Sequence, residues 1–178
     1  MSRTVYVNGE YLPEEQGKVS MFDRGFLFAD GVYEVTPVVR GKLVDYEAHL
    51  ERLVRSLAAI RITGAPTRND LDNMHMGLIH KNSLTEGYIY MQITRGAADR
   101  DFKFPKDVKP TMVGFTQKAN LVDNPHATVG VKVVTVPDLR WKRRDIKSVM
   151  LLGPVLGKQE AYENGAYEGW MVEDGYVT

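Results

Sequence analysis

The sequence predicts an α+β protein of two domains. Short segments of alternating side chains, separated by turn-forming dipeptides such as Asn8-Gly9, predict antiparallel strands. Two segments with helical spacing of apolar residues lie among them, and the periodicity is lost at residues 117–125 before strand and helix patterns resume. We therefore expect an N-terminal α/β domain at residues 1–118, an interdomain linker at 119–126 and the start of a C-terminal domain at 127–178.

Turn signals and periodicity place the elements of the first domain. Asn8-Gly9 and Arg40-Gly41 are typical of tight turns, so each joins the arms of a hairpin. Thr67 and Asp70 resemble a capping box, which opens a helix. The expected strands are residues 4–7, 10–12, 32–39, 42–46, 87–95 and 110–115, and the expected helices are residues 47–60 and a second that begins at Thr67. Helical spacing assigns to the core Leu50, Leu53, Val54, Leu57, Leu71, Met74, Met76, Leu78 and Ile79.

The second domain is expected to open with a strand at residues 129–136. A polar loop then leads to Lys147, and a helix from about 151 to 163 follows despite Pro154, stopping at Asn164-Gly165. Residues 169–172 form a strand, and Asp174-Gly175 turns the chain into its last residues. So few elements do not close a core, so we expect this chain to be the N-terminal part of a longer protein.

The composition excludes several classes of function. Basic and acidic residues number 23 each, so net charge gives no reason to expect nucleic acid or a membrane as a partner. The absence of cysteine removes disulfides and thiolate chemistry. His75 and His80 lack the spacing and carboxylate partners of a metal site, so no metal is expected. No apolar run is long enough to span a bilayer. The default expectation is a cytoplasmic protein.

One lysine stands out in a basic segment. Lys147 follows Arg140, Arg143 and Arg144, and like charges favour the neutral form of an amine. A neutral amine is a nucleophile that can form a Schiff base with an aldehyde cofactor. The arginines suit a phosphate or a carboxylate, which a guanidinium binds in bidentate fashion. The simpler interpretation of the same residues is a basic surface loop.

Several blocks in order and spacing point to one family, and they run from the first hairpin to the last residue. The blocks are Gly25; Asp30-Gly31-Val32-Tyr33-Glu34-Val35; His49-Leu50-Glu51-Arg52-Leu53; Thr94-Arg95-Gly96; Asp145-Ile146-Lys147-Ser148; and Gly165-Ala166-Tyr167-Glu168. The chain resembles the two-domain fold-type IV pyridoxal phosphate enzymes, and most closely the bacterial D-amino-acid aminotransferases. The resemblance implies a homodimer, with Tyr33 and the region of Arg24 near the partner.

The resemblance implies roles for residues that bind the cofactor, pyridoxal 5'-phosphate. Lys147 matches the lysine that holds this cofactor as a Schiff base and then moves a proton between substrate and cofactor. Arg52 matches the arginine that binds the phosphate, for which a guanidinium fork is suited. His49 lies three residues earlier and is expected to contribute to the same pocket. Without the family pattern, Arg52 and His49 would be interpreted as solvent-facing helix residues.

Substrate-binding roles are implied for three further residues. Tyr33 matches a tyrosine on the substrate side of the cofactor, often across the dimer interface, and Tyr90 matches a second tyrosine of the pocket. Half-buried strand aromatics are the simpler interpretation of both. Arg100 matches the arginine that traps the substrate carboxylate together with a histidine, but here that partner position is Phe102. Either Arg100 works alone, or Arg24 or another arginine contributes, or the substrate range has shifted towards larger or apolar substrates.

The resemblance also implies groups that follow Thr178, namely the acidic partner of the pyridine nitrogen and further phosphate ligands. The nitrogen partner keeps the ring protonated as an electron sink. If the protein ended at Thr178, we would expect weak cofactor binding and little or no transamination.

The leading interpretation is a D-amino-acid aminotransferase that moves the amino group of D-alanine or a similar donor to a 2-oxo acid such as 2-oxoglutarate. Two enzymes of the same fold are the alternatives: an L-branched-chain aminotransferase, favoured by the apolar Phe102, and an aminodeoxychorismate lyase, which uses the same lysine. A non-enzymatic domain that binds a phosphorylated or acidic partner through the basic segment before Lys147 is the alternative from another class.

Overall fold

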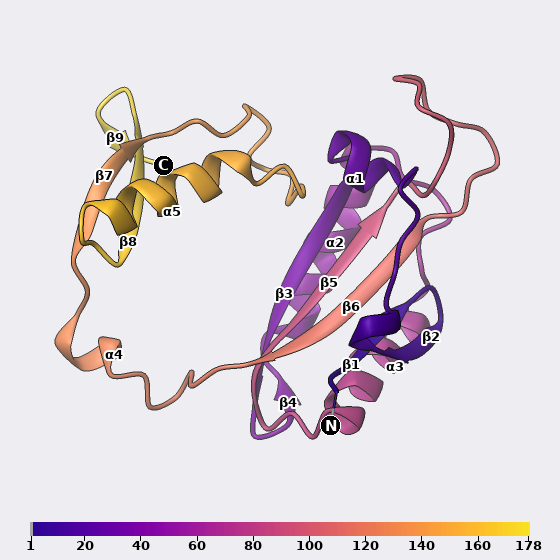
Figure 1. The fold of residues 1–178 in the computed structure, drawn as a ribbon, viewed down its shortest axis with the longest axis horizontal. Coiled ribbons are helices and arrows are strands. Elements are labelled where there is room, and N and C mark those ends of the chain that lie inside the picture. Colours follow the sequence, from indigo (N-terminus) through magenta and orange to yellow (C-terminus); the bar gives the residue numbers. More distant parts are fainter. Residues whose placement is uncertain (1) are drawn as a thin grey trace. The chain divides into compact units, whose positions relative to one another are not determined.

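The computed structural model describes residues 2–178, which divide into two compact units (Figure 1). The first unit runs to Val122 and also takes in Asp145–Val149. The second consists of Asp123–Arg144 and Met150–Thr178. The segment that carries Lys147 therefore packs with the first unit, although the residues before and after it in the chain belong to the second unit. Over residues 2–178, no helix combines the length and the apolar character that crossing a membrane requires.

The first unit is built on a six-stranded sheet of order β2-β1-β6-β5-β3-β4, in which neighbouring strands are antiparallel. Its strands are β1 Thr4–Val7, β2 Glu10–Pro13, β3 Gly31–Val39, β4 Lys42–Leu43, β5 Glu86–Thr94 and β6 Thr111–Lys118. Its helices are α1 Arg24–Phe28, α2 Tyr46–Ala59, α3 Arg68–Lys81 and the 3-10 turn η1 Glu14–Gln16. This mixture of antiparallel strands and separate helices confirms the predicted α+β class.

The two predicted hairpins form, but the second is shorter than expected. Asn8 and Gly9 both adopt positive φ angles, 48° and 101°, as a tight two-residue turn requires. The arm predicted at residues 42–46 ends at Leu43. Asp45 takes a left-handed conformation with a φ of 50°, and Tyr46 already begins α2. The positive φ breaks the extended conformation, so the alternation seen in the sequence does not continue as a strand.

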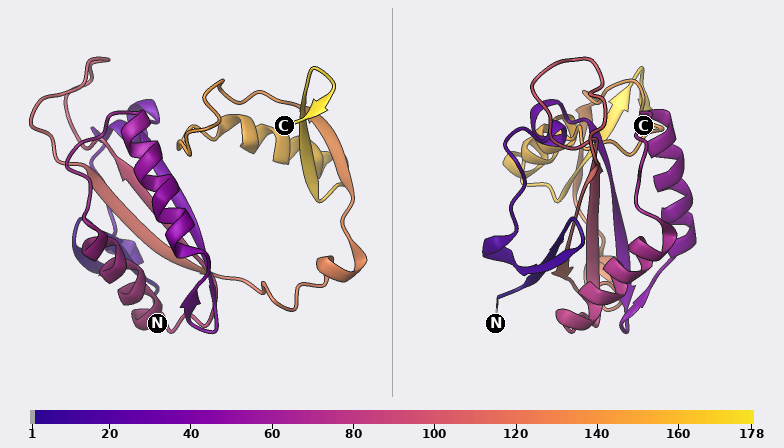
Figure 2. Two further views of the ribbon diagram at one scale, coloured as in Figure 1. Left: turned by 180° about the vertical axis from the view of Figure 1, so that it is seen from behind. Right: turned by 90° about the vertical axis from the view of Figure 1, so that its right-hand side faces the viewer.

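Helices α2 and α3 lie against the same face of this sheet (Figure 2). The capping box is present: the Thr67 side chain accepts from the Asp70 amide, and the Asp70 carboxylate accepts from the Thr67 amide. Two core assignments are wrong, because Val54 is 64% exposed and Met76 is 53% exposed. Around the helix axis, Val54 lies about 40° beyond Leu50 and Met76 about 60° beyond Ile79, so each falls just outside the packed stripe. The other assigned residues are buried: Leu50, Leu53, Leu57, Leu71, Met74, Leu78 and Ile79.

The second unit contains a three-stranded sheet of order β7-β8-β9. Its elements are α4 His126–Val129, β7 Val133–Pro137, α5 Leu152–Glu163, β8 Glu168–Glu173 and β9 Tyr176–Val177. β7 and β8 pair in parallel on either side of α5 in the chain, whereas β8 and β9 form an antiparallel hairpin. Pro154 is tolerated because it lies in the first turn of α5, where amide groups have no intrahelical acceptor.

The strand predicted at residues 129–136 begins late. Residues His126–Val129 form the single helical turn α4, which Pro125 opens, and Gly130 follows with a φ of 74°. The strand proper begins only at Val133. A proline followed by a left-handed glycine imposes a turn on residues whose β-branched side chains favour a strand, and the local backbone restriction prevails.

Candidate active site

The lysine segment extends the sheet along the edge of β3 that β4 leaves free, because β4 pairs only with Val38 and Val39. The Tyr33 amide donates to the Lys147 carbonyl at 3.0 Å, and the Val149 amide donates to the Gly31 carbonyl at 3.1 Å. Val32 and Ser148 form an antiparallel bridge between these two hydrogen bonds. Because side chains alternate along paired strands, this register puts Lys147 on the same face as Tyr33.

The Lys147 amine lies on the phenol of Tyr33. Its Nζ donates to the Tyr33 hydroxyl at 3.0 Å and lies 4.3 Å from the centroid of the Tyr33 ring. The lysine is half-buried. Both residues belong to the first unit, so this contact lies within one chain. The structure thus brings together two residues that the resemblance assigned to the site, Lys147 and Tyr33.

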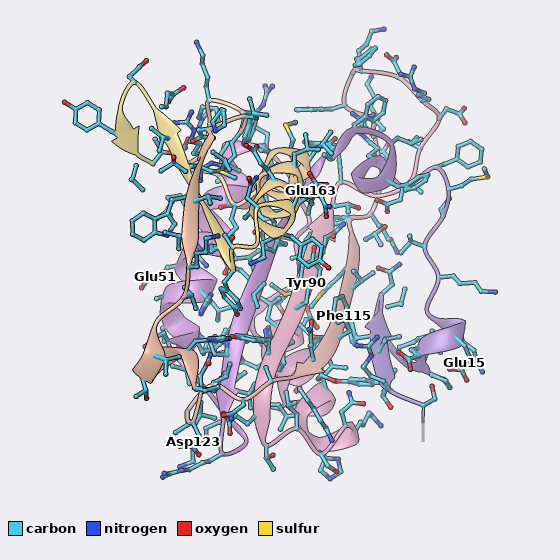
Figure 3. All side chains as sticks on the ribbon, turned by 60° about the vertical axis from the view of Figure 1, so that its left-hand side comes forward. Glu15, Glu51, Tyr90, Phe115, Asp123 and Glu163 are labelled. Carbon is cyan, nitrogen blue, oxygen red and sulfur yellow. The ribbon has the colours of Figure 1, made fainter. Side chains whose placement is uncertain are left out.

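Tyr33 begins a row of aromatic side chains on the sheet face turned away from α2 and α3. The rings of Tyr33 and Tyr90 stack with centroids 5.6 Å apart, and those of Tyr90 and Phe115 with centroids 4.9 Å apart. Figure 3 shows Tyr90 and Phe115 side by side on β5 and β6. Burial, with a smaller contribution from Tyr33, raises the pKa of Tyr90 to about 12, so its hydroxyl stays protonated at neutral pH and donates to Gln92 at 2.8 Å.

Helix α2 presents one polar stripe to the same part of the structure. His49, Arg52 and Ser56 are spaced by three and four residues and so share one face of the helix. The Ser56 hydroxyl accepts a hydrogen bond from the Lys147 amide at 3.3 Å, and the residue is 1% exposed. The backbone of Lys147 is therefore held at its amide by α2 and at its carbonyl by β3.

The other two residues of the stripe converge on a buried carboxylate. Arg52 donates through Nε and Nη2 to the two oxygens of Glu34, at 2.8 and 2.6 Å. His49 Nδ1 donates to Glu34 Oε2 at 2.7 Å. Glu34 lies on β3 and is 1% exposed, whereas the Arg52 side chain is 38% exposed. Hydrogen bonding to Glu34 raises the pKa of Arg52, so the guanidinium is fixed as a cation that still reaches solvent.

Arg100 lies in a different setting from the lysine. Its guanidinium carbon is 5.3 Å from the centroid of Phe28 and 5.4 Å from that of Phe102. Among the described residues, no contact joins it to Lys147. Arg24, the suggested substitute, is buried: it pairs with Asp30 at 2.8 Å and donates to the Asp101 carbonyl at 2.6 Å. Unlike the partly exposed Arg52, Arg24 is thus both buried and engaged within this chain, and we do not assign it to the substrate.

Two of the matched sequence blocks, those that contain Asp30 and Arg95, meet in an ion pair. Asp30 accepts from Nε and Nη2 of Arg95, at 2.7 and 2.9 Å, in addition to Arg24. Although burial acts in the opposite direction, these two guanidiniums hold the pKa of Asp30 below its usual range. Arg95 also donates to the carbonyls of Ile60 and Arg61. The charge pattern around Asp30 therefore ties α1, β5 and the end of α2 together.

Two arginines of the basic segment have carboxylate partners within the second unit. Arg140 pairs with Asp138 at 2.7 Å, and Arg144 pairs with Glu173 at 2.8 Å. The hydrogen bonds from Arg140 hold the pKa of Asp138 well below its usual range. Of the two partners expected for these arginines, a phosphate or a carboxylate, Arg140 and Arg144 thus bind carboxylates of this chain.

Sequence reasoning assigned no role to two residues of the site, Glu34 and Ser56. Glu34 was visible only as part of a matched block, and Ser56 was not among the residues assigned to the core. A signal for Glu34 existed: an acid on the packed side of a strand needs a cationic partner, and a histidine and an arginine three residues apart follow on the next helix. Ser56 carried no comparable signal.

Comparisons with known proteins identify the family of this chain. Residues 31–178 match the model of the class IV aminotransferases. This chain belongs to the class IV aminotransferase family. As a class IV aminotransferase, it is 41% identical over 177 residues to a D-alanine aminotransferase of Staphylococcus epidermidis, an alignment that covers 98% of the chain and 62% of the relative. The chain thus spans about three fifths of the length of the curated relatives it matches.

Solved structures show the same fold for this class IV aminotransferase. An Escherichia coli branched-chain amino acid aminotransferase superposes with a TM-score of 0.86 at 20% identity, covering the whole chain and 62% of that structure. A branched-chain aminotransferase from the archaeon Thermoproteus uzoniensis, solved with norvaline, superposes with a TM-score of 0.80 at 19% identity, over 98% of the chain and 61% of the other. At such identities the likeness establishes the fold, and it confirms the fold-type IV architecture inferred from the sequence.

Proposed function

We propose that the protein is a D-amino-acid aminotransferase that uses pyridoxal 5'-phosphate. The observation that carries the proposal is the Lys147 amine on the Tyr33 phenol, at the free edge of β3, in a class IV chain with D-alanine aminotransferases among its relatives. The reaction would transfer the amino group of a D-amino acid such as D-alanine to a 2-oxo acid such as 2-oxoglutarate.

The residues present fit the cofactor. A half-buried primary amine that hydrogen-bonds a phenol suits attachment of an aldehyde, and a partly exposed guanidinium suits a phosphate. When bound, the cofactor supplies the electron sink that stabilises negative charge on the substrate α-carbon. We assign Lys147 to cofactor attachment, Arg52 to the phosphate and His49 to the same pocket. Families of this class use pyridoxal phosphate, which supports the assignment of Lys147 to its attachment.

We assign proton transfer, positioning of the amine and substrate binding to residues of this chain. Lys147 serves first as nucleophile and then as the base that takes and returns a substrate proton at Nζ. Tyr33 holds Nζ in place through its hydroxyl. The stacked Tyr90 is neutral at neutral pH and lines the same face. Arg100 is proposed to take the substrate carboxylate, beside Phe102 where other D-specific enzymes have a histidine.

A branched-chain L-amino-acid aminotransferase is the second candidate. Phe102 favours it, because an exposed aromatic ring beside Arg100 suits an apolar substrate side chain. An aminodeoxychorismate lyase would use the same lysine. We further propose a homodimer located in the cytoplasm; the family resemblance supports the dimer.

The test is substrate-dependent turnover of the protein loaded with pyridoxal 5'-phosphate. D-alanine, L-leucine and aminodeoxychorismate are supplied separately, and the 2-oxo acid or aromatic product is quantified. Conversion of D-alanine is expected. Conversion of L-leucine alone would move the function to the branched-chain group, and conversion of aminodeoxychorismate alone to the lyase.

Replacement of the lysine separates an enzyme from a binding domain. Lys147→Arg keeps the positive charge but removes the nucleophilic amine, so nearly all turnover and all borohydride-fixed cofactor on the peptide containing residue 147 are expected to be lost. Lys142→Arg, at an exposed lysine of the same segment, is the matched control and should retain both. Full function in Lys147→Arg would instead support binding of an acidic partner by charge alone.

A further inference from the structure

The carboxylate of Glu34 has no role in the chemistry described so far, yet it is buried and both of its oxygens are paired. It lies on β3, 1% exposed, and accepts three hydrogen bonds from two side chains of α2. A buried carboxylate is costly unless it is paired and hydrogen-bonded. Each oxygen here has a charged or polar donor at 2.8 Å or less, so the arrangement is stable only with Arg52 and His49 in these positions.

The pairing fixes the orientation of Arg52. Nε and Nη2 lie on one edge of the planar guanidinium, and both bind Glu34, which leaves no freedom to rotate about the last bonds of the side chain. The side chain nonetheless remains 38% exposed. An anion that approaches from solvent therefore meets a guanidinium whose plane is already set, and does not have to order a flexible side chain on binding.

We propose that Glu34 is a positioning residue for phosphate recognition: it holds the guanidinium of Arg52, with His49 as a second donor to the same carboxylate, so that Arg52 binds the cofactor phosphate in one orientation. The inference rests on the proposed function, because Arg52 is assigned there to that phosphate.

Electrostatics alone predicts the opposite effect of removing the carboxylate. A negative charge 2.6 Å from the guanidinium offsets its positive charge, so without Glu34 an anion would be attracted more strongly. Orientation and charge therefore give effects of opposite sign on phosphate affinity. This makes the role of Glu34 measurable by binding alone, without turnover.

The experiment compares dissociation constants for pyridoxal 5'-phosphate and for pyridoxal, which lacks the phosphate, in the full chain freed of cofactor. The constant for pyridoxal divided by that for pyridoxal 5'-phosphate, called here the phosphate ratio, isolates phosphate recognition, since attachment to Lys147 is common to both. The variants are Glu34→Gln, Glu34→Asp, Arg52→Lys and, as a matched control, Glu51→Gln, an exposed glutamate on the same helix as Arg52. Circular dichroism and thermal unfolding report whether each variant folds.

We expect Glu34→Gln to lower the phosphate ratio by roughly tenfold, the scale of one well-aligned charge-assisted contact. Glu34→Asp keeps the charge but is one methylene too short for the same bonds, so it should lower the phosphate ratio in the same direction and supplies the answer if Glu34→Gln fails to fold. In the Arg52→Lys background, Glu34→Asp should have no further effect. Glu51→Gln should leave the phosphate ratio unchanged.

A phosphate ratio that is unchanged or raised in Glu34→Asp, with the wild type still favouring the phosphorylated ligand, would overturn the positioning role and leave the proposed function intact. A wild type that binds both ligands equally would instead refute the assignment of Arg52 and, with it, the basis of the proposal.

Discussion

Removing the hydroxyl of Ser56 should loosen the lysine segment from the first unit. The Ser56 hydroxyl lies 3.3 Å from the amide of Lys147, and Ser56 is buried on the packed side of α2. The residues on either side of the lysine, Ile146 and Ser148, are buried as well. In Ser56→Ala the Lys147 amide loses its acceptor in surroundings that admit little water.

The cost follows from this burial. A buried donor left without its acceptor costs about 1–3 kcal/mol, and a long bond such as this one belongs at the lower end, about 1–1.5 kcal/mol. Since about 1.4 kcal/mol corresponds to a factor of ten in an equilibrium constant, the segment should open roughly five- to tenfold more often. The unfolding free energy of the first unit should fall by the same amount.

Amide hydrogen exchange measures this opening directly. In Ser56→Ala, exchange at the amides of Lys147 and Val149 should accelerate by the stated factor, while Arg55→Ala, at an exposed position next in the helix, should leave it unchanged. Urea unfolding gives the accompanying change in stability. If the Lys147 amide exchanged at the wild-type rate in Ser56→Ala, the hydroxyl would not hold the segment, and the reasoning would fail.

Two further predictions concern buried His75 and Gly96 of the first unit, the latter with Gly175 of the second unit as its control. Burial lowers the pKa of His75 from its ordinary value near 6.5, and its Nε2 is buried without a partner among the described residues. Below about pH 6.5 the folded protein therefore binds fewer protons than the unfolded chain, so its stability should fall as the pH drops. Urea unfolding at pH 5.5 and 7.5 tests this: His75→Leu should flatten the dependence, and the same change at exposed His80 should not. Gly96→Ala should destabilise by more than about 2 kcal/mol, because φ is 100° and the added Cβ would lie 2.1 Å from the Lys109 carbonyl oxygen, whereas Gly175→Ala, with φ at 83° and nothing within 4 Å, should cost only about 1 kcal/mol. A thermal or urea titration in which the two glycine variants lose equal stability would contradict the steric argument.

Local signals predicted most elements, and they failed where two local rules competed. Asn8-Gly9 and the Thr67 capping box act through neighbouring backbone groups, so the sequence contains their whole cause. At residues 129–132 a strand was predicted from the β-branched side chains, but Pro125 and Gly130 imposed a turn. Val54 matched the apolar pattern, yet its side chain points to solvent, because the width of the packed stripe depends on the partner surface.

The site was predicted unevenly for the same kind of reason. Lys147 and Tyr33 were identified by their blocks, and the structure joins them by a hydrogen bond. Arg24 was suggested as a substrate ligand because a sequence shows a charged residue but not its partner. In the structure that partner is Asp30. Ser56 gave no signal, since a serine on a helix is interpreted as solvated until the segment that covers it is known.

By itself, the sequence determined the α+β class, the hairpin turns, the helix caps, the family and the lysine, because each depends on short-range geometry or on motifs in order along the chain. Only the tertiary structure decided that Asp145–Val149 pairs with β3, that Glu34 engages His49 and Arg52, and that Ser56 holds the lysine backbone. These contacts join residues 15 to 118 positions apart, from Glu34 with His49 to Gly31 with Val149. The energy of a hydrogen bond depends on distance in space, and no spacing along the chain encodes which distant strand edge or helix face a residue will meet.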